Sequence, residues 1–293
     1  MKVGLIGHPV SHSRSPELQN AAFAACGLAD WTYELWDTPP NEVPMRMREM
    51  RHTASIAGAN VTVPHKQAVI HYLAGMSEAA RAIGAVNTIT KEPSGAMIGH
   101  NTDWIGFAED LRQHGIDLSK MNDVRALVLG AGGSARAIVY ALLKNNLKVM
   151  LINRDAARAE KIADDMLRLR SRSFHPRIIG AGSARFSRMD VPSPKLIVNC
   201  TSAGMTPNED TSPWPADAPF PADAILYDLV YKPSATKLMA DAAGAGLRVI
   251  GGIGMLAEQA AAAFELWTGV SSVRVSGMMR KVIDGGRETE DEN

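Results

Sequence analysis

A glycine-rich turn is the first feature of this sequence with a chemical consequence. The sequence Gly-Ala-Gly-Gly at 130–133 follows an apolar run directly and precedes an expected helix over 135–143. Gly130 permits a sharp turn, Gly132 lets a phosphate group approach the backbone, and Ala135 takes the place of a third glycine. Free N–H groups at the start of the helix would bind a pyrophosphate. We therefore expect a dinucleotide to bind here, against the alternative of a purely structural glycine turn.

The end of the following strand bears on which dinucleotide fits. Asn153, Arg154 and Asp155 lie at this end, and Arg158 follows about one helical turn later. An acidic residue here accepts hydrogen bonds from the ribose hydroxyls of NAD, whereas an arginine favours the extra phosphate of NADP. Arg154 and Arg158 favour NADP and Asp155 favours NAD, while Arg158 is equally compatible with a solvated helix face. We predict NADP, with NAD as the alternative.

Three polar segments outside this region lie where side chains could meet around a substrate. Each is expected at a strand end or a helix start, which is where functional side chains commonly converge. The segments are HSRSP (12–16), NVTVPHK (60–66), and AVNT (85–88) followed by NTD (101–103). Taken singly, Lys66 is compatible with an exposed helix cation, Asp103 with a helix cap before Trp104, and Ser15 with a helix cap.

The elements that must position these residues follow an α/β pattern. Before residue 104 we expect strands over 2–6, 31–36 and 56–63, a hairpin over 85–90 and 96–100, and helices from Ser15, over 44–51 and over 66–73. Residues 104–251 alternate strands with helices, which predicts a doubly wound parallel sheet covered on both faces. Within them, 171–182 is expected to be a linker and 206–221, with five prolines, a loop. A charged tail is expected over 287–293.

Composition narrows the classes of protein. Lys plus Arg and Asp plus Glu both number 31, a balance that argues against nucleic acid or an anionic membrane as the main partner. Cys26 and Cys200 are expected to be small buried residues, with no disulfide framework. No apolar run has the length of a membrane span or a signal peptide, so we expect a cytoplasmic location. His8 and His12 are four residues apart, but Pro9 breaks the helix that would align them, and we expect no metal site.

The polar segments and the glycine turn together resemble the shikimate dehydrogenase family, which includes the quinate/shikimate dehydrogenases. The resemblance covers nearly the whole chain, because the matching strings occur in the family's order from end to end. These strings are HSRSP (12–16), NVTVPHK (60–66), GAVNT (84–88), NTD (101–103), GAGGSARA (130–137), NR (153–154), TSAGM (201–205), YKP (231–233) and GMLAEQA (254–260).

The resemblance implies a catalytic pair and a substrate site. Lys66 and Asp103 correspond to the catalytic pair: a ketone reduced by hydride needs a proton on its oxygen, which a lysine ammonium can donate. Neutral side chains suit a polyol because they both donate and accept hydrogen bonds. The implied substrate-binding residues are Ser13 and Ser15 for the carboxylate, Asn60, Thr62, Asn87 and Gln259 for the ring hydroxyls, and Lys66, Asp103 and Tyr231.

The same resemblance implies the residues that hold the dinucleotide. Tyr231, Gly254 and Met255 correspond to residues at the nicotinamide end, with Met205 nearby, although Met255 is equally compatible with a core position. The implied cofactor-binding residues are Gly130, Ala131, Gly132, Gly133, Ser134, Ala135, Asn153, Arg154, Asp155, Arg158, Thr201, Met205, Leu229, Gly252 and Met255.

Two positions depart from the family pattern. Trp104 stands where many members have glycine, so it either reshapes the substrate site or packs the start of its helix. Asp155 stands where a small hydroxyl residue often helps to hold the NADP phosphate, which leaves the cofactor preference open.

The predicted architecture has a substrate-binding domain of residues 1–103 and 252–293, and an NADP-binding Rossmann domain of residues 104–251, with the active cleft between them. The expected reaction is reversible NADPH-dependent reduction of 3-dehydroshikimate to shikimate, on the route to chorismate and the aromatic amino acids. The alternatives are a quinate/shikimate dehydrogenase that prefers NAD and acts oxidatively, and a nucleotide-sensing regulator without turnover. The expected state is a monomer or a homodimer.

Overall fold

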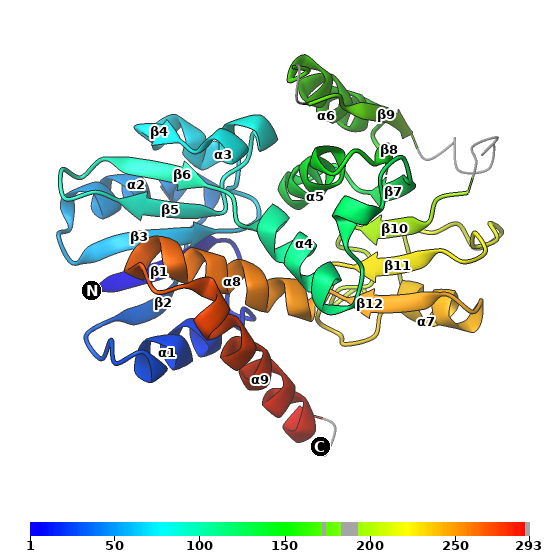
Figure 1. The fold of residues 1–293 in the computed structure, drawn as a ribbon. Helices are drawn as coiled ribbons and strands as arrows, with labels where there is room; N and C mark the ends of the chain where they lie inside the picture. Colours follow the sequence, from blue (N-terminus) through cyan, green and yellow to red (C-terminus); the bar gives the residue numbers. More distant parts are fainter. Residues whose placement is uncertain (172–173, 183–192, 291–293) are drawn as a thin grey trace. The chain divides into compact units, whose positions relative to one another are not determined.

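The computed structural model describes residues 1–171, 174–182 and 193–290, with only the backbone described over 284–290 (Figure 1). The chain divides into two compact units. The first unit consists of residues 1–109 and 254–293, and the second unit of residues 110–253. Each unit is built on its own sheet with helices beside it, which confirms the predicted α/β class.

The sheet of the first unit brings several strand ends to one edge. Its described strands lie in the order β2 (Thr32–Asp37), β1 (Lys2–Gly7), β3 (Ile56–Val61), β5 (Thr88–Lys91), β6 (Met97–His100) and β4 (Gly75–Met76). Strands β1, β2 and β3 are parallel, and β5 and β6 form the predicted antiparallel hairpin. Because β5 runs antiparallel to β3, β5 begins and β6 ends at the edge where β1, β2 and β3 end. The segments that follow these strand ends are the polar segments singled out above.

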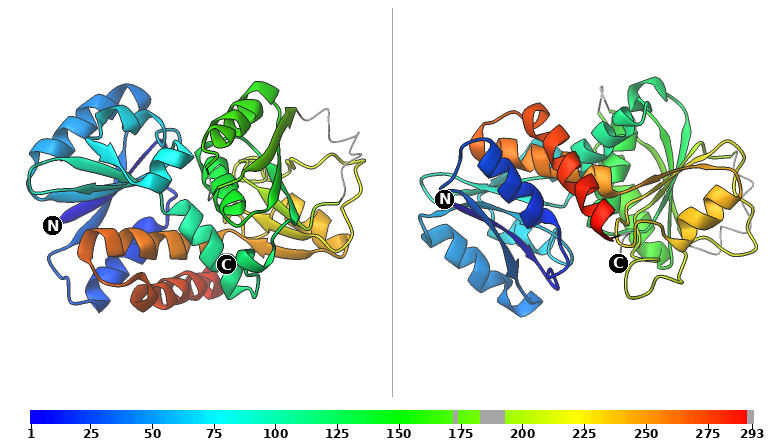
Figure 2. Two further views of the ribbon diagram at one scale, coloured as in Figure 1. Left: turned by 45° about the horizontal axis from the view of Figure 1, so that its top comes forward. Right: turned by 90° about the horizontal axis from the view of Figure 1, so that it is seen from below.

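Helices cover both faces of this sheet (Figures 1 and 2). On one face, α1 (Ser15–Ala25) packs on α8 (Ile253–Thr268), where the rings of Phe23 and Phe264 lie 5.0 Å apart between centroids. On the other face, α2 (Val43–His52) and α3 (Glu78–Ile83) contribute Met47, Met50 and Ala80 to a buried cluster. Helix α9 (Ser272–Glu290) packs on α1. The returning C-terminal helices thus complete the first unit.

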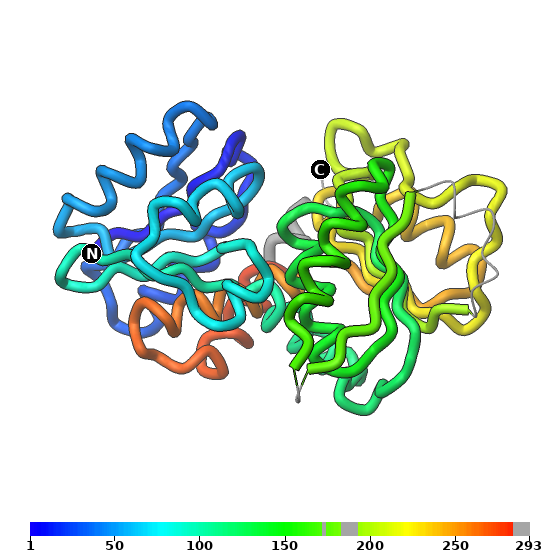
Figure 3. Tube along the Cα trace, turned by 90° about the horizontal axis from the view of Figure 1, so that it is seen from above, coloured from blue at the N-terminus to red at the C-terminus, as the bar shows by residue number. Residues whose placement is uncertain are grey.

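The second unit contains the predicted doubly wound sheet. Its described strands are all parallel, in the order β12 (Arg248–Gly251), β11 (Ile225–Asp228), β10 (Leu196–Asn199), β7 (Arg125–Leu129), β8 (Lys148–Asn153) and β9 (Arg177–Gly182). Helices α5 (Gly133–Lys144) and α6 (Ala156–Arg168) lie on one face, and α7 (Lys237–Gly244) lies on the other (Figure 3). Strand order reverses between β7 and β10, the point at which such sheets bind ligands.

Several local predictions were wrong. Residues 177–182 of the predicted linker form β9, which pairs with β8, while residues 172–173 lie outside the described residues. The predicted helix over 66–73 is a turn followed by the short 3-10 helix Ala68–Tyr72. Helix α9 continues to Glu290, into the predicted tail, whose last residues, 291–293, lie outside the described part. Cys26 and Cys200 were predicted to be buried, but both are partly exposed.

Candidate active site

Lys66 and Asp103 form a close ion pair in the first unit. The Lys66 Nζ lies 2.6 Å from Asp103 Oδ2, and the two side chains are only 11% and 6% exposed. Lys66 follows the end of β3, and its carbonyl accepts a hydrogen bond from the Val86 N–H, which fixes the backbone beside β5. Asp103 is the first residue of α4 (Asp103–Gln113). A shielded pair of this kind can keep a proton donor at a defined position.

Asn87 holds the second oxygen of the same carboxylate. Its Nδ2 donates to Asp103 Oδ1 at 2.7 Å, and its Oδ1 accepts from the Thr102 N–H at 2.7 Å. Both oxygens of Asp103 therefore accept from side chains, and the Asp103 N–H donates to Asn101 Oδ1 at 3.1 Å. The Asp103 carboxylate thus pairs with Lys66 and Asn87 rather than acting as the helix cap that was the alternative.

The two predicted serines lie together at the start of α1. The Ser13 hydroxyl donates to Ser15 Oγ at 3.2 Å and accepts from the Ser15 N–H at 3.3 Å. Ser15 is buried and is the first helical residue, with Arg14 before it at the cap, so the cap alternative for Ser15 was wrong. Two neighbouring hydroxyls near a helix start are suitable donors for a carboxylate.

Three further predicted substrate residues belong to the same unit. Asn60 is the next-to-last residue of β3 and is buried. Thr62 is half-buried and packs so closely on Gly7 that a Cβ there would lie 2.3 Å from Thr62 Cγ2. Gln259 comes from α8, and its Oε1 accepts from Asn87 Nδ2 at 3.5 Å. The fold thus brings residue 259 beside residue 87. Tyr231 belongs to the second unit, where it is half-buried.

The glycine turn has the geometry that a dinucleotide requires. Gly130 has φ of +100°, and a Cβ there would lie 3.0 Å from Thr201 Cγ2 and 3.1 Å from the Cys200 carbonyl. Gly132 has no heavy atom within 4 Å of a Cβ position, so the approach to its backbone is open. Gly133 and Ser134 begin α5, and Ala135 is fully buried against the sheet. The turn thus combines a strained glycine with an open one, and it fits a pyrophosphate.

Asp155 has a role that the sequence did not reveal. Its Oδ1 accepts from the Ala157 N–H at 3.1 Å, so it is the N-cap of α6. Asn153 Nδ2 donates to the Asp155 carbonyl at 3.0 Å, which closes the turn after β8. Arg154, Asp155 and Arg158 are all exposed. The carboxylate therefore has a structural hydrogen bond, while both guanidinium groups reach solvent.

The remaining predicted cofactor residues differ in their exposure. Thr201 Oγ1 donates to Asn199 Oδ1 at 2.7 Å. A Cβ on Gly252 would lie 2.3 Å from the Leu229 carbonyl, so the backbone there requires glycine. Met255, in the first unit, is 6% exposed, in keeping with the core alternative. The side chains of Ala131, Met205 and Leu229 are half-buried, and Gly254 is buried.

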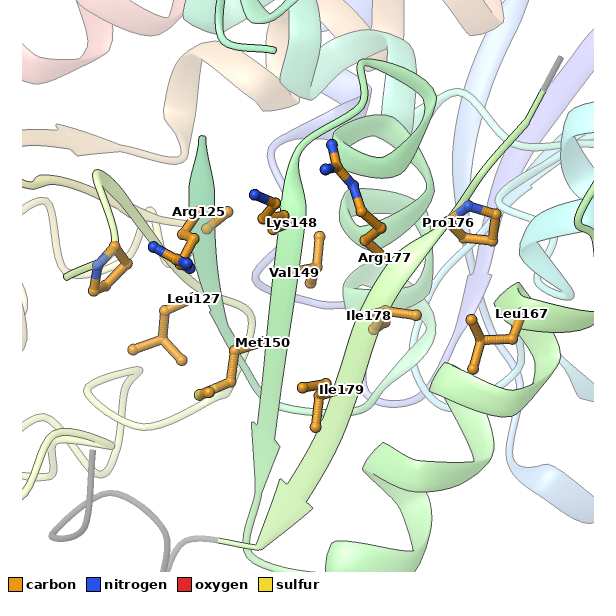
Figure 4. A pocket seen from close by; sticks show the side chains of 12 residues that line it. Arg125, Leu127, Lys148, Val149, Met150, Leu167, Pro176, Arg177, Ile178 and Ile179 are labelled. Atoms are coloured by element: carbon orange, nitrogen blue, oxygen red, sulfur yellow. The ribbon is translucent and has the colours of Figure 1, made fainter. Parts of the chain in front are cut away.

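The second unit also has a cavity away from all these residues. It measures about 340 Å³ and is lined by side chains of β7, β8 and β9 with Leu167 of α6 (Figure 4). Apolar side chains form most of its wall, with Arg125, Lys148 and Arg177 among the lining residues. None of the predicted site residues lines it.

Three side chains that form hydrogen bonds with the predicted site residues were not predicted from the sequence. Tyr33 donates to Asn60 Oδ1 at 2.8 Å, and the hydroxyls of Thr88 and Thr102 lie within hydrogen-bond distance of Asn87 Oδ1 at 3.0 and 3.3 Å. Tyr33 lies outside every polar segment, and only its alternation along β2 signals that it points inward. No group of three potential metal ligands occurs among the described residues, and no described helix combines the length and apolar character needed to cross a bilayer.

Comparison with known proteins decides the family. Models of the "Shikimate dehydrogenase substrate binding domain", "Shikimate / quinate 5-dehydrogenase" and "Shikimate 5'-dehydrogenase C-terminal domain" match residues 5–89, 112–175 and 252–283. The shikimate dehydrogenase (NADP(+)) of Symbiobacterium thermophilum is 39% identical over 268 residues, covering 91% of this chain and 88% of that protein. That of Moorella thermoacetica is 41% identical over 268 residues, with the same coverage of 91% and 88%. The chain belongs to the shikimate dehydrogenase family.

A solved structure of this family agrees with the fold. The shikimate 5-dehydrogenase of Thermus thermophilus, in complex with NADP(H) and shikimate, superimposes with a TM-score of 0.80 at 36% identity. The match covers 96% of this chain and 99% of that one. Membership of the shikimate dehydrogenase family confirms the resemblance drawn from the ordered motifs.

Proposed function

We propose that this protein is a shikimate dehydrogenase that reversibly reduces 3-dehydroshikimate to shikimate with NADPH. The observation that carries the proposal is the buried Lys66–Asp103 pair, 2.6 Å apart, among neutral hydrogen-bonding side chains at one edge of the first unit's sheet. Reduction of a keto-polyol needs a proton donor at the carbonyl oxygen and hydrogen-bonding side chains for the hydroxyl groups, and this site contains both kinds of group.

Lys66 is the proposed proton donor. The turn of residues 130–133 would hold NADPH, which when bound would supply the hydride that reduces the carbonyl carbon. The Lys66 ammonium donates a hydrogen bond to the carbonyl oxygen, stabilises the negative charge that develops there, and gives up a proton to form the hydroxyl. Asp103 holds the ammonium in place, and Asn87 holds Asp103. In the oxidative direction, neutral Lys66 takes the proton back from the hydroxyl.

The proposed substrate contacts follow from the chemistry of each group. Ser13 and Ser15 donate to the ring carboxylate, and Asn60, Thr62, Asn87 and Gln259 contact the ring hydroxyls. Burial of Asn60 and Asn87 strengthens this selectivity, because a substrate without the matching hydroxyl leaves a buried polar group unpaired. Tyr231, a residue of the second unit, is the remaining proposed substrate contact.

NADP is the proposed cofactor, bound at the turn of residues 130–133. The exposed guanidinium groups of Arg154 and Arg158 are available for the additional phosphate of NADP. The Asp155 carboxylate accepts from the Ala157 N–H, so one of its oxygens is held at the start of α6. Relatives at 39–41% identity are named as NADP(+) enzymes, which supports the same choice.

One kinetic comparison tests the proposal. The values of kcat/KM are measured for shikimate and quinate, each with NADP and with NAD. We expect shikimate with NADP to give the highest value. A higher value for quinate with NAD would instead favour a catabolic quinate/shikimate dehydrogenase, and no oxidation of shikimate with either cofactor would refute the proposal and favour a regulator without turnover.

We also propose a cellular location and an oligomeric state for the protein. A shikimate dehydrogenase acts on the route to chorismate and the aromatic amino acids, in the cytoplasm. We propose a monomer or a homodimer, which sedimentation analysis of the purified chain distinguishes.

A further inference from the structure

Tyr33 is a buried tyrosine that ties two parts of the proposed substrate site together. It lies on β2, is 3% exposed, and donates its hydroxyl proton to Asn60 Oδ1 at 2.8 Å. Its backbone is held by Asn20 of α1, whose Oδ1 accepts from the Tyr33 N–H at 2.8 Å and whose Nδ2 donates to the Tyr33 carbonyl at 3.1 Å. The residue is therefore fixed both at its main chain and at its hydroxyl.

The hydrogen bond from Tyr33 sets the orientation of the Asn60 amide. Because Oδ1 accepts from the phenol, Nδ2 points the other way and donates to the Asn87 carbonyl at 3.2 Å and to Thr88 Oγ1 at 3.1 Å. With both amide hydrogens used, the second lone pair of Oδ1 remains suited to accept a hydrogen bond from a substrate hydroxyl. A flipped amide would present a donor there instead.

The same series of bonds continues to the ion pair. Thr88 Oγ1 donates to Asn87 Oδ1 at 3.0 Å, and Asn87 Nδ2 donates to Asp103 Oδ1 at 2.7 Å. Asp103 in turn holds the Lys66 ammonium. Tyr33 thus lies at the beginning of a buried polar chain that ends at the proposed proton donor.

The Ser15 side chain is also within hydrogen-bond reach of the Tyr33 phenol. Burial raises the pKa of the Tyr33 phenol far above its ordinary value, and a hydrogen bond with the Ser15 side chain opposes this shift without reversing it. The phenol therefore stays protonated and acts as the donor to Asn60 throughout the pH range of ordinary assays. Tyr33 thus contacts one proposed carboxylate-binding residue, Ser15, and one proposed hydroxyl-binding residue, Asn60.

We propose that Tyr33 is a positioning residue that fixes the orientation of the Asn60 amide. The inference rests on the proposed function, since it assigns Asn60 and Ser15 to the substrate. Tyr33 itself acts through Asn60 and does not take part in proton transfer.

The test is Tyr33→Phe, which removes one oxygen and keeps the ring. Because the buried Asn60 Oδ1 loses its donor, we expect the KM for shikimate to rise about tenfold, with kcat reduced by less than about threefold and the KM for NADP unchanged. Tyr227→Phe is the matched control: Tyr227 is buried in the second unit and donates to Asp110 Oδ2 at 2.5 Å. It should lower thermal stability and leave the KM for shikimate unchanged.

A double-variant cycle separates positioning from a general loss of stability. If Tyr33 acts through Asn60, Tyr33→Phe should change the KM for shikimate by less than about twofold in an Asn60→Ala background, because the amide it orients is gone. Equal effects in both backgrounds, or a KM for shikimate unchanged by Tyr33→Phe in the wild type, would overturn the inference.

A second variant covers the case in which Tyr33→Phe fails to fold. Asn20→Asp removes the donor to the Tyr33 carbonyl and keeps the acceptor for its N–H, and should raise the KM for shikimate about twofold to threefold. An unchanged KM would again overturn the inference. If the wild type does not oxidise shikimate, the proposed function and this inference both fail. If the wild type oxidises shikimate but the Tyr33 and Asn20 variants have the wild-type KM for shikimate, the inference alone fails.

Discussion

The Lys66 ammonium and the Asp103 carboxylate lie 2.6 Å apart although 37 positions separate the two residues in the sequence. Strand β3 leads to the first residue and strand β6 to the second, and both strands end at the same edge of the first unit's sheet. The pairing therefore depends on the antiparallel hairpin β5–β6, which returns the chain to that edge.

Replacement of Lys66 tests the proposed proton transfer. Lys66→Ala removes the donor, so we expect kcat to fall by about 10²–10⁴ while the Kd for shikimate, measured by calorimetry, changes by less than about tenfold. Lys120→Ala, at a lysine side chain that is 82% exposed, removes the same charge and should leave kcat unchanged. Turnover by Lys66→Ala at the wild-type rate would remove Lys66 from the mechanism.

Two glycines of the turn should respond differently to alanine. Gly130 has φ of +100° and close neighbours, so Gly130→Ala should lower the free energy of unfolding by about 1–3 kcal/mol. Gly132 has an ordinary φ and open space around it, so Gly132→Ala should cost at most about 1 kcal/mol and mainly raise the KM for NADP. Chemical denaturation and steady-state kinetics measure the two effects. An unchanged KM for NADP in Gly132→Ala would contradict the assignment of Gly132 to the pyrophosphate.

The residues after β8 should set the choice between NADP and NAD. Arg154→Ala should reduce the ratio of kcat/KM with NADP to kcat/KM with NAD by about tenfold to a hundredfold, because a charge-assisted hydrogen bond to the phosphate is lost. Asp155→Ser keeps a good N-cap for α6 but removes a negative charge, and should raise the same ratio. Arg170→Ala, at an exposed arginine after α6, is the control and should leave it unchanged. A ratio unaffected by Arg154→Ala would show that the phosphate binds elsewhere.

Asp228 should make the stability of the protein depend on pH. Burial raises the pKa of its carboxyl above the ordinary 3.8, although Val230, Thr236 and Asn199 donate hydrogen bonds that act in the opposite direction. The folded state then binds the proton more tightly than the unfolded state. The stability from this group is complete below about pH 3.8 and is lost as the pH rises from there through the raised pKa of the folded state.

Asp228→Asn removes that titration. Relative to the wild type, the melting temperature of Asp228→Asn should rise as the pH increases from about 3.8 through the raised pKa of Asp228. Each unit of pKa difference corresponds to about 1.4 kcal/mol. Asp241→Asn, at an exposed carboxylate of α7, is the control. A difference between wild type and Asp228→Asn that stays constant with pH would contradict the raised pKa.

Most elements could be predicted because their signals are local. Alternation and apolar runs mark the strands, and Pro16 and Glu17 mark the first turn of α1. Strand β9 was not predicted because its two glycines, Gly180 and Gly182, are typical of a linker. In the structure, Gly180 lets the strand approach α6 so closely that a Cβ would lie 2.5 Å from the Ala159 backbone. A close approach between two elements leaves no mark in the local sequence other than a glycine.

The sequence by itself determined the class of fold, the glycine turn at 130–133, the family, and the residue types of the proposed substrate site, since each depends on short motifs and their order. Only the tertiary structure decided which of these side chains pair. It decided that Asp103 accepts from Lys66 and Asn87, that Asp155 caps α6, and that Tyr33 donates to Asn60. The distances between these side chains are set by where helices begin and by the register of the strands, which places Asn60 opposite Thr88. Register is a property of the folded sheet and cannot be obtained from local spacing in the sequence.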